Sequence, residues 1–172
     1  RQFLRGLGMA SLAATSLGSL PGCIPGAVGG SAPLSELSVV EIQRRMAAGS
    51  LTAERLTNYF LQRIHRLDRN GPRLNSVIEL NPEAVAMARA LDDERRAKGP
   101  RGPLHGVPVL IKDNIDTGDR MQTTAGSLAL AGSTAPKDAF IVTRLRAAGA
   151  VVLGKTNLSE WANYRSRRSS SG

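Results

Sequence analysis

The sequence predicts an α/β fold, in which helices flank an incomplete, mixed or mostly parallel sheet and further helices precede it. Residues 107–111 and 150–154 are two short, continuous apolar runs, which are typical of strands buried on both faces. A helical pattern lies between them, starting at Asp138 and stopping at Gly149. Strand, helix and strand in this order indicate a parallel pair joined by a right-handed crossover.

Two helices are expected at the N-terminal side of the sheet. Ser38 and Glu41 have the spacing of a capping box, and Gly49 is a suitable residue just past the end of that helix. Thr52 opens the second helix. Its apolar face is formed by residues at helical spacing: Leu56, Phe60, Ile64 and Leu67.

Further elements are expected along the chain. Residues 74–80 have the partial alternation of a strand, and Asn81 with Pro82 at the first helical position starts a third helix that ends at Gly99. In the fourth helix Asp138 is the expected cap. One face of that helix carries Ile141, Leu145 and Ala148. Asn157 with Glu160 signals one more helix start.

Composition fits one globular domain without a nucleic-acid or metal site. Hydrophobic residues make up 41% of the 172 residues and charged residues 22%, which suits a buried core. The net charge is +9, but residues 31–100 are nearly balanced and no basic stripe is interleaved with aromatic side chains. One cysteine and two histidines far apart in sequence form no ligand cluster. We therefore expect no metal site, and no attraction to nucleic acid beyond a weak and non-specific one, although a basic nucleic-acid binder is an alternative that the net charge raises. We also expect no cofactor.

The beginning of the chain is similar to an export signal. Residues 1–26 combine a basic start with an apolar stretch of small residues, and their opening resembles a twin-arginine signal without its first arginine. The stretch is too short and too rich in Gly and Ser for a membrane span. Residues 27–33 form a Gly/Pro-rich linker. We expect an exported protein, periplasmic or secreted.

Cys23 is a candidate lipidation site. Residues 20–23 resemble a lipoprotein cleavage box, with an imperfect proline at the second position. The alternative is cleavage near Gly26 and Ala27, which would discard Cys23. Contact with a membrane is thus expected only through export or a lipid anchor.

Lys112 directly follows the first predicted buried strand. Ligands of α/β sheets gather at the carboxyl ends of strands. Apolar surroundings disfavour an ammonium group, and a neutral amine can take a proton from a serine hydroxyl, as Ser–Lys hydrolases require. The alternative is a lysine that reaches solvent from the strand end, paired with Asp113 or Asp116. Spacing alone identifies no partner serine.

Several motifs in order resemble the amidase signature family. Residues 102–116 (Gly-Pro-Leu-His-Gly-Val-Pro-Val-Leu-Ile-Lys-Asp-Asn-Ile-Asp) resemble the lysine motif of that family, and residues 123–127 (Thr-Thr-Ala-Gly-Ser) resemble its next loop. Residues 138–142 and 154–162 match the following helix and turn. The resemblance covers roughly residues 34–172, which would form the N-terminal part of an amidase domain.

The resemblance implies the amidase-signature fold and hydrolysis of carboxylic amide C–N bonds by a Ser–cisSer–Lys triad acting on a small-molecule amide. Lys112 matches the catalytic lysine. Five further residues match positions that support the site: Asp113, Asn114, Thr124, Gly126 and Ser127. The two serines of the family lie in a Gly/Ser-rich segment well after residue 161. We therefore expect this chain to lack them and to be inactive by itself.

Other serines of the chain are less suitable nucleophiles. Residues 169–171 follow Trp161 too closely, and Ser127 matches a structural loop.

Two other functions stay open. The amidase subunit of a tRNA-dependent amidotransferase shares these motifs, although an export signal argues against it because tRNA charging is cytosolic. The other alternative is a non-catalytic exported protein with an amidase-like fold.

Overall fold

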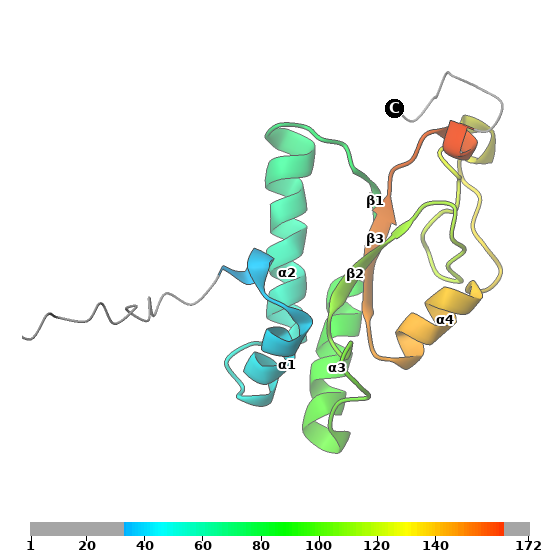
Figure 1. Ribbon diagram of the computed structural model, residues 1–172. Coiled ribbons are helices and arrows are strands. Elements are labelled where there is room, and N and C mark those ends of the chain that lie inside the picture. Colours follow the sequence, from blue (N-terminus) through cyan, green and yellow to red (C-terminus); the bar gives the residue numbers. More distant parts are fainter. Residues whose placement is uncertain (1–32, 164–172) are drawn as a thin grey trace, which may run out of the picture. The chain divides into compact units, whose positions relative to one another are not determined.

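The computed structural model describes residues 33–163 (Figure 1). The expected export signal, nearly all of the expected linker, Cys23 and the serines at 169–171 lie outside these residues. None of the helices within residues 33–163 is long and apolar enough to cross a membrane.

Three strands form one mixed sheet: β1 (Val77–Leu80), β2 (Pro108–Lys112) and β3 (Val151–Thr156). Their order is β1-β3-β2, so β3 is central. It runs parallel to β2 and antiparallel to β1. The predicted parallel pair with its intervening helix is therefore confirmed, and the strand expected over residues 74–80 forms over its second half.

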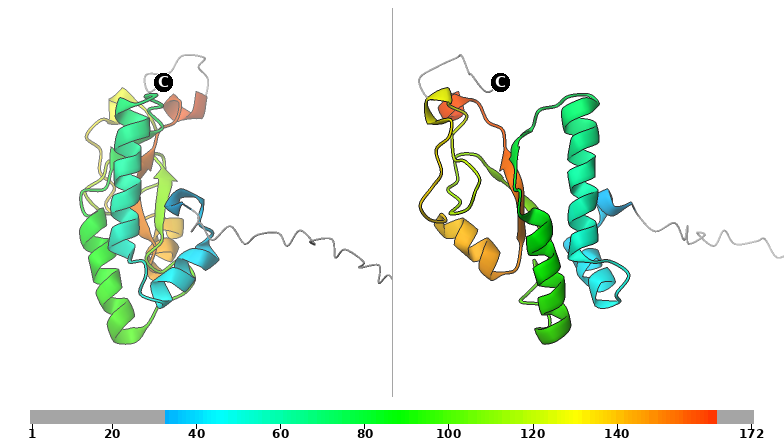
Figure 2. Two further views of the ribbon diagram at one scale, coloured as in Figure 1. Left: turned by 90° about the vertical axis from the view of Figure 1, so that its left-hand side faces the viewer. Right: turned by 180° about the vertical axis from the view of Figure 1, so that it is seen from behind.

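Helices cover both faces of this sheet, with α2 and α3 on one side and α4 on the other (Figures 1 and 2). The α-helices are α1 (Val39–Ala47), α2 (Ala53–Arg63), α3 (Ala84–Lys98) and α4 (Phe140–Ala147). Short turns of other helical types lie between and beside them: η1 (Leu34–Glu36), η2 (Ile64–Asn70), η3 (Leu128–Leu130) and η4 (Glu160–Asn163). The π-helical η2 directly continues α2.

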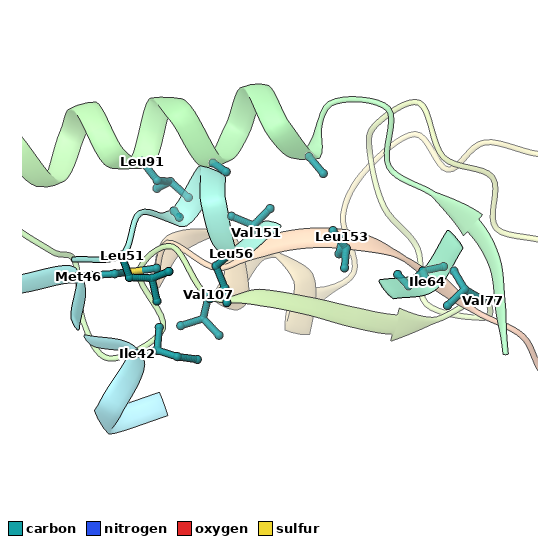
Figure 3. Packing of buried hydrophobic residues seen from close by; sticks show 13 residues of the cluster. Ile42, Met46, Leu51, Leu56, Ile64, Val77, Leu91, Val107, Val151 and Leu153 are labelled. Atoms are coloured by element: carbon teal, nitrogen blue, oxygen red, sulfur yellow. The ribbon is translucent and has the colours of Figure 1, made fainter. Parts of the chain in front are cut away.

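Two apolar cores hold the layers together. The larger one packs α1, α2 and α3 against the sheet and includes Leu56, Leu91 and Val151 (Figure 3). The smaller one lies on the α4 side, where Val142 packs with Val152 and others. Because both cores contact β3, all but its last residue are buried. The central strand is thereby held between the two helical layers.

The first two helix starts follow the sequence prediction. The Ser38 hydroxyl accepts a hydrogen bond from the Glu41 amide at 3.2 Å, and Thr52 accepts one from the Arg55 amide at 3.0 Å. Gly49 has the left-handed φ of 69° that favours glycine after a helix. The Glu41 carboxylate, however, binds Arg44 and Arg45 instead of returning to the cap.

Three other helix predictions were wrong in detail. The third helix begins at Ala84, two residues after Pro82. Asp138 does not cap α4, because its carboxylate accepts from the Gly118 amide and pairs with Arg146. Ile141 is 51% exposed. Val142 is the buried residue of this helix instead, because it is the side chain that packs against Val152 of the sheet.

The predicted burial of both strands on both faces is correct only for β3. The strand β2 lies at one edge of the sheet and leaves Leu110 38% exposed. The helix expected after Asn157 is a 3₁₀ turn in which Trp161 and Ala162 have left-handed backbone angles. The Asn157 side chain donates a hydrogen bond to the Asn75 carbonyl and accepts one from the Leu158 amide.

Asp68 joins the end of η2 to the start of β1. Its carboxylate accepts hydrogen bonds from the amides of Ser76 at 2.7 Å and Val77 at 3.2 Å, and from the Ser76 hydroxyl. Burial acts to raise the pKa of Asp68, but these hydrogen bonds outweigh it and lower the pKa below the ordinary value of 3.8. The ionised carboxylate therefore stabilises the fold.

Replacing Asp68 with asparagine should lower the free energy of unfolding by about 2 kcal/mol at pH 7, because charge-assisted hydrogen bonds are lost. Since folding lowers the pKa, this contribution is present above about pH 4 and is lost as the pH falls through the folded-state pKa. Urea unfolding of both proteins at pH 7 and pH 3 measures the effect. An equal difference at the two pH values would contradict it.

Candidate active site

Lys112 is the last residue of β2 and lies opposite Thr156 of β3. Its carbonyl accepts a hydrogen bond from the Ile115 amide at 3.0 Å, which forms a tight turn immediately after the strand. The side chain is exposed, so the apolar surroundings expected for it are not present within residues 33–163. The turn thus holds the backbone of Lys112, while its side chain is exposed.

Asp113 is turned the other way and is only 1% exposed. Its carboxylate accepts hydrogen bonds from the amides of Thr124 at 3.2 Å and Gly126 at 3.4 Å, and from the Thr124 hydroxyl. Its backbone amide donates to the Thr156 carbonyl at 3.1 Å. Asp113 thus ties the end of β2 to β3 and to the loop over residues 123–127.

The loop over residues 123–127 has a left-handed turn at its centre. Ala125 and Gly126 have φ values of 50° and 68°, and the Ala125 amide donates to the Asp113 carbonyl at 3.2 Å. The Ser127 hydroxyl donates to the Glu160 carboxylate at 2.6 Å. The Trp161 amide donates to the Ala125 carbonyl at 2.9 Å. These two hydrogen bonds connect the loop to the segment that follows β3.

Two cavities flank this loop. One, of about 280 Å³, is lined by Asp113, Thr124, Gly126 and Ser127 together with Glu79, Gln122 and apolar neighbours. The other, of about 480 Å³, has a lining that includes Asn114, Asp116 and Trp161. Four of the five predicted supporting residues thus share the first cavity, and Asn114, which is exposed, borders the second.

Lys155 is a residue of this site to which the sequence interpretation gave no role. It is 0% exposed and is the last residue but one of β3. Its ammonium donates to the Ile115 carbonyl at 2.8 Å and to the Thr123 hydroxyl at 3.0 Å. Burial lowers the pKa of Lys155, although nearby carboxylates, first among them Asp113, act to raise it.

A signal for Lys155 was present in the sequence. Lys155 directly follows the apolar run over residues 150–154, and a strand buried on both faces has little room to turn such a side chain toward water. Glu160 is expected from the sequence only at a helix start. Its hydrogen bond with Ser127 joins residues 33 positions apart, so no local sequence pattern predicts it.

His105 has a structural role. It is fully buried, its Nδ1 accepts a hydrogen bond from the Arg101 amide at 3.2 Å, and its Nε2 lies 2.9 Å from the Leu91 carbonyl. Because Nδ1 accepts, Nε2 carries the proton and donates to Leu91. Across residues 33–163, no group of three side chains is placed to hold a metal ion.

Similarity to known proteins agrees with this geometry. The profile of the family described as Amidase matches residues 55–171. The chain belongs to the amidase family. Among solved structures, the native peptide amidase from Stenotrophomonas maltophilia is similar, with 58% identity and a TM-score of 0.76 over 80% of this chain and 28% of that chain. The predicted α/β amidase fold is therefore confirmed for this part of the molecule.

Sequence relatives carry two kinds of name. A Schizosaccharomyces pombe protein named as an amidase is 44% identical over 139 residues, which are 81% of this chain and 23% of that protein. A glutamyl-tRNA(Gln) amidotransferase subunit from Chloroflexus aurantiacus is also 44% identical, over 75% of this chain and 26% of that protein. The chain spans about a quarter of the length of these relatives.

Proposed function

We propose that the full-length protein hydrolyses carboxylic amides and that Lys112 is its general base. The observation that carries this proposal is the contrast between Lys112 and Asp113. The backbone of both is fixed at the carboxyl end of β2, but Asp113 is buried in the loop contacts while the Lys112 side chain is exposed. An amine on a rigid strand end is well placed to meet a reacting group.

The chemistry requires Lys112 to react in its neutral form, because only a neutral amine can accept a proton. Lys112 would accept the proton of a serine hydroxyl, directly or through a second serine, as the resemblance to Ser–cisSer–Lys hydrolases implies. The serine oxygen would bond to the amide carbon, and the C–N bond would break as the leaving nitrogen takes a proton. Water would then hydrolyse the resulting ester and restore the serine.

Peptide amides are the substrate class that we propose. The similarity to the Stenotrophomonas peptide amidase, at 58% identity, is higher than the 44% identity to the amidotransferase protein. An export signal in residues 1–26, which we propose from their sequence, would also separate the protein from cytosolic tRNA.

The proposal is tested by incubating the full-length protein with a peptide amide and measuring released ammonia. We expect ammonia release that requires neither glutamyl-tRNA nor ATP. Ammonia release from glutamine only in the presence of charged tRNA would favour the amidotransferase instead. The absence of hydrolysis of any simple, peptide or aryl amide would favour the non-catalytic alternative.

A further inference from the structure

Lys155 places a positive charge inside the sheet edge that carries Lys112. It pairs with Ile111 in the register of β2 and β3, one position before the pair of Lys112 and Thr156. The residues on its N-terminal side in β3 are apolar or glycine and are all buried. The ammonium group of Lys155 is therefore shielded from solvent, and its hydrogen bonds are made within the protein.

These hydrogen bonds join the two segments that hold the candidate site. Ile115 belongs to the turn that binds the Lys112 carbonyl, and Thr123 begins the loop whose next residues hold Asp113. One ammonium group thus bridges residues 112–116 and 123–127, at 2.8 and 3.0 Å. Without it, the contacts of Asp113 would still join the turn to the loop, but the Ile115 end of the turn would lose its tie to Thr123.

Folding by itself does not explain a lysine at this position. Burial lowers the pKa of Lys155 despite the opposing effect of Asp113, Asp119, Glu79 and Asp116, so the ammonium is held at a cost. Apolar side chains of similar volume often replace buried charges without loss of stability. Buried groups perturbed in this way are concentrated at functional sites.

We propose that Lys155 is a positioning residue for amide hydrolysis, which fixes the turn over residues 112–116 against the loop over residues 123–127 and thereby directs the amine of Lys112. This inference rests on the proposed function. Lys155 touches neither substrate nor the reacting atoms in this role. It acts through the Ile115 carbonyl and the Thr123 hydroxyl.

The test uses the full-length protein and the variant Lys155→Met, which keeps much of the length of the side chain and removes the donor. We expect kcat to fall about 10- to 100-fold, because a displacement near 1 Å of a reacting group can cost about 100-fold in rate. KM should change by less than about 2-fold, because no substrate contact is removed. Lys98→Met, at an exposed position on α3, is the matched control.

A purely structural role gives a different result. It would lower the fraction of folded enzyme, measured by thermal unfolding, and leave kcat per folded molecule unchanged, which would overturn the inference. Thr123→Val removes one acceptor at nearly constant volume and is expected to lower kcat about 3- to 10-fold. In the Lys155→Met background, Thr123→Val should lower kcat little further, because the interaction between the two side chains is already lost.

The variants also separate this inference from the proposed function. If the wild-type protein hydrolyses no amide, both are overturned. If the wild type is active and Lys155→Met has the same kcat, only the role of Lys155 is overturned. Should Lys155→Met fail to fold, Thr123→Val decides, and an unchanged kcat in that variant overturns the inference.

Discussion

Replacing Lys112 with methionine is expected to lower kcat for amide hydrolysis by about 10²- to 10⁴-fold, the usual contribution of a positioned general base. Methionine keeps much of the length and volume of the side chain but accepts no proton. Because Lys112 is exposed at the end of β2, the free energy of unfolding should change by less than about 0.5 kcal/mol. The measurement is ammonia release from a peptide amide by the full-length protein, with thermal unfolding in parallel.

The control for this substitution is Lys137→Met, which removes another exposed lysine outside the sheet. It should retain wild-type kcat and KM. A Lys112→Met variant with more than about a tenth of wild-type kcat would show that another group takes the proton. Equal losses in the Lys112 and Lys137 variants would point to a general effect of surface charge.

Features set by neighbouring residues could be predicted from the sequence. The caps at Ser38 and Thr52 and the stop at Gly49 depend on hydrogen bonds and backbone angles within one helical turn. The parallel pair β2 and β3 follows from the order of apolar runs and the helix between them. These elements also place Lys112 at a strand end.

Features set by distant partners could not be predicted in this way. Asp138 has the sequence context of a cap, but Arg146 and the Gly118 amide compete for its carboxylate. Residues 107–111 resemble a central strand, and only the sheet order shows that β2 is an edge. The supporting roles proposed for Asp113 and Thr124 came from family resemblance, while the bonds between them are visible only in the fold.

The contacts of Asp113 lead to the second large expected effect, on stability. Replacing Asp113 with alanine should lower the free energy of unfolding by about 3–5 kcal/mol, because the amides of Thr124 and Gly126 lose a buried, charged acceptor. The ammonium of Lys155 would also lose the carboxylate that acts most strongly to keep it charged. Urea unfolding of the wild type and the variant measures the difference.

Asparagine at position 113 separates charge from hydrogen bonding. Asp113→Asn keeps one acceptor oxygen at nearly the same volume, so we expect roughly half of the loss seen with alanine. If both variants unfold like the wild type, the carboxylate does not hold the loop. If asparagine restores stability but kcat remains low, the charge of Asp113 acts on the site beyond holding the loop in place.

Such an effect of Asp113 would act through Lys155. Of the nearby carboxylates, Asp113 acts most strongly to raise the pKa of Lys155. In Asp113→Asn the ammonium of Lys155 would stay buried without its strongest opposing charge, which is costlier than removing both groups together. The combination of Asp113→Asn with Lys155→Met would then recover part of the stability lost in Asp113→Asn alone, because neither buried charge would remain without its partner. Urea unfolding of the two single variants and the double variant measures this coupling, and strictly additive losses would show that the two charges act independently.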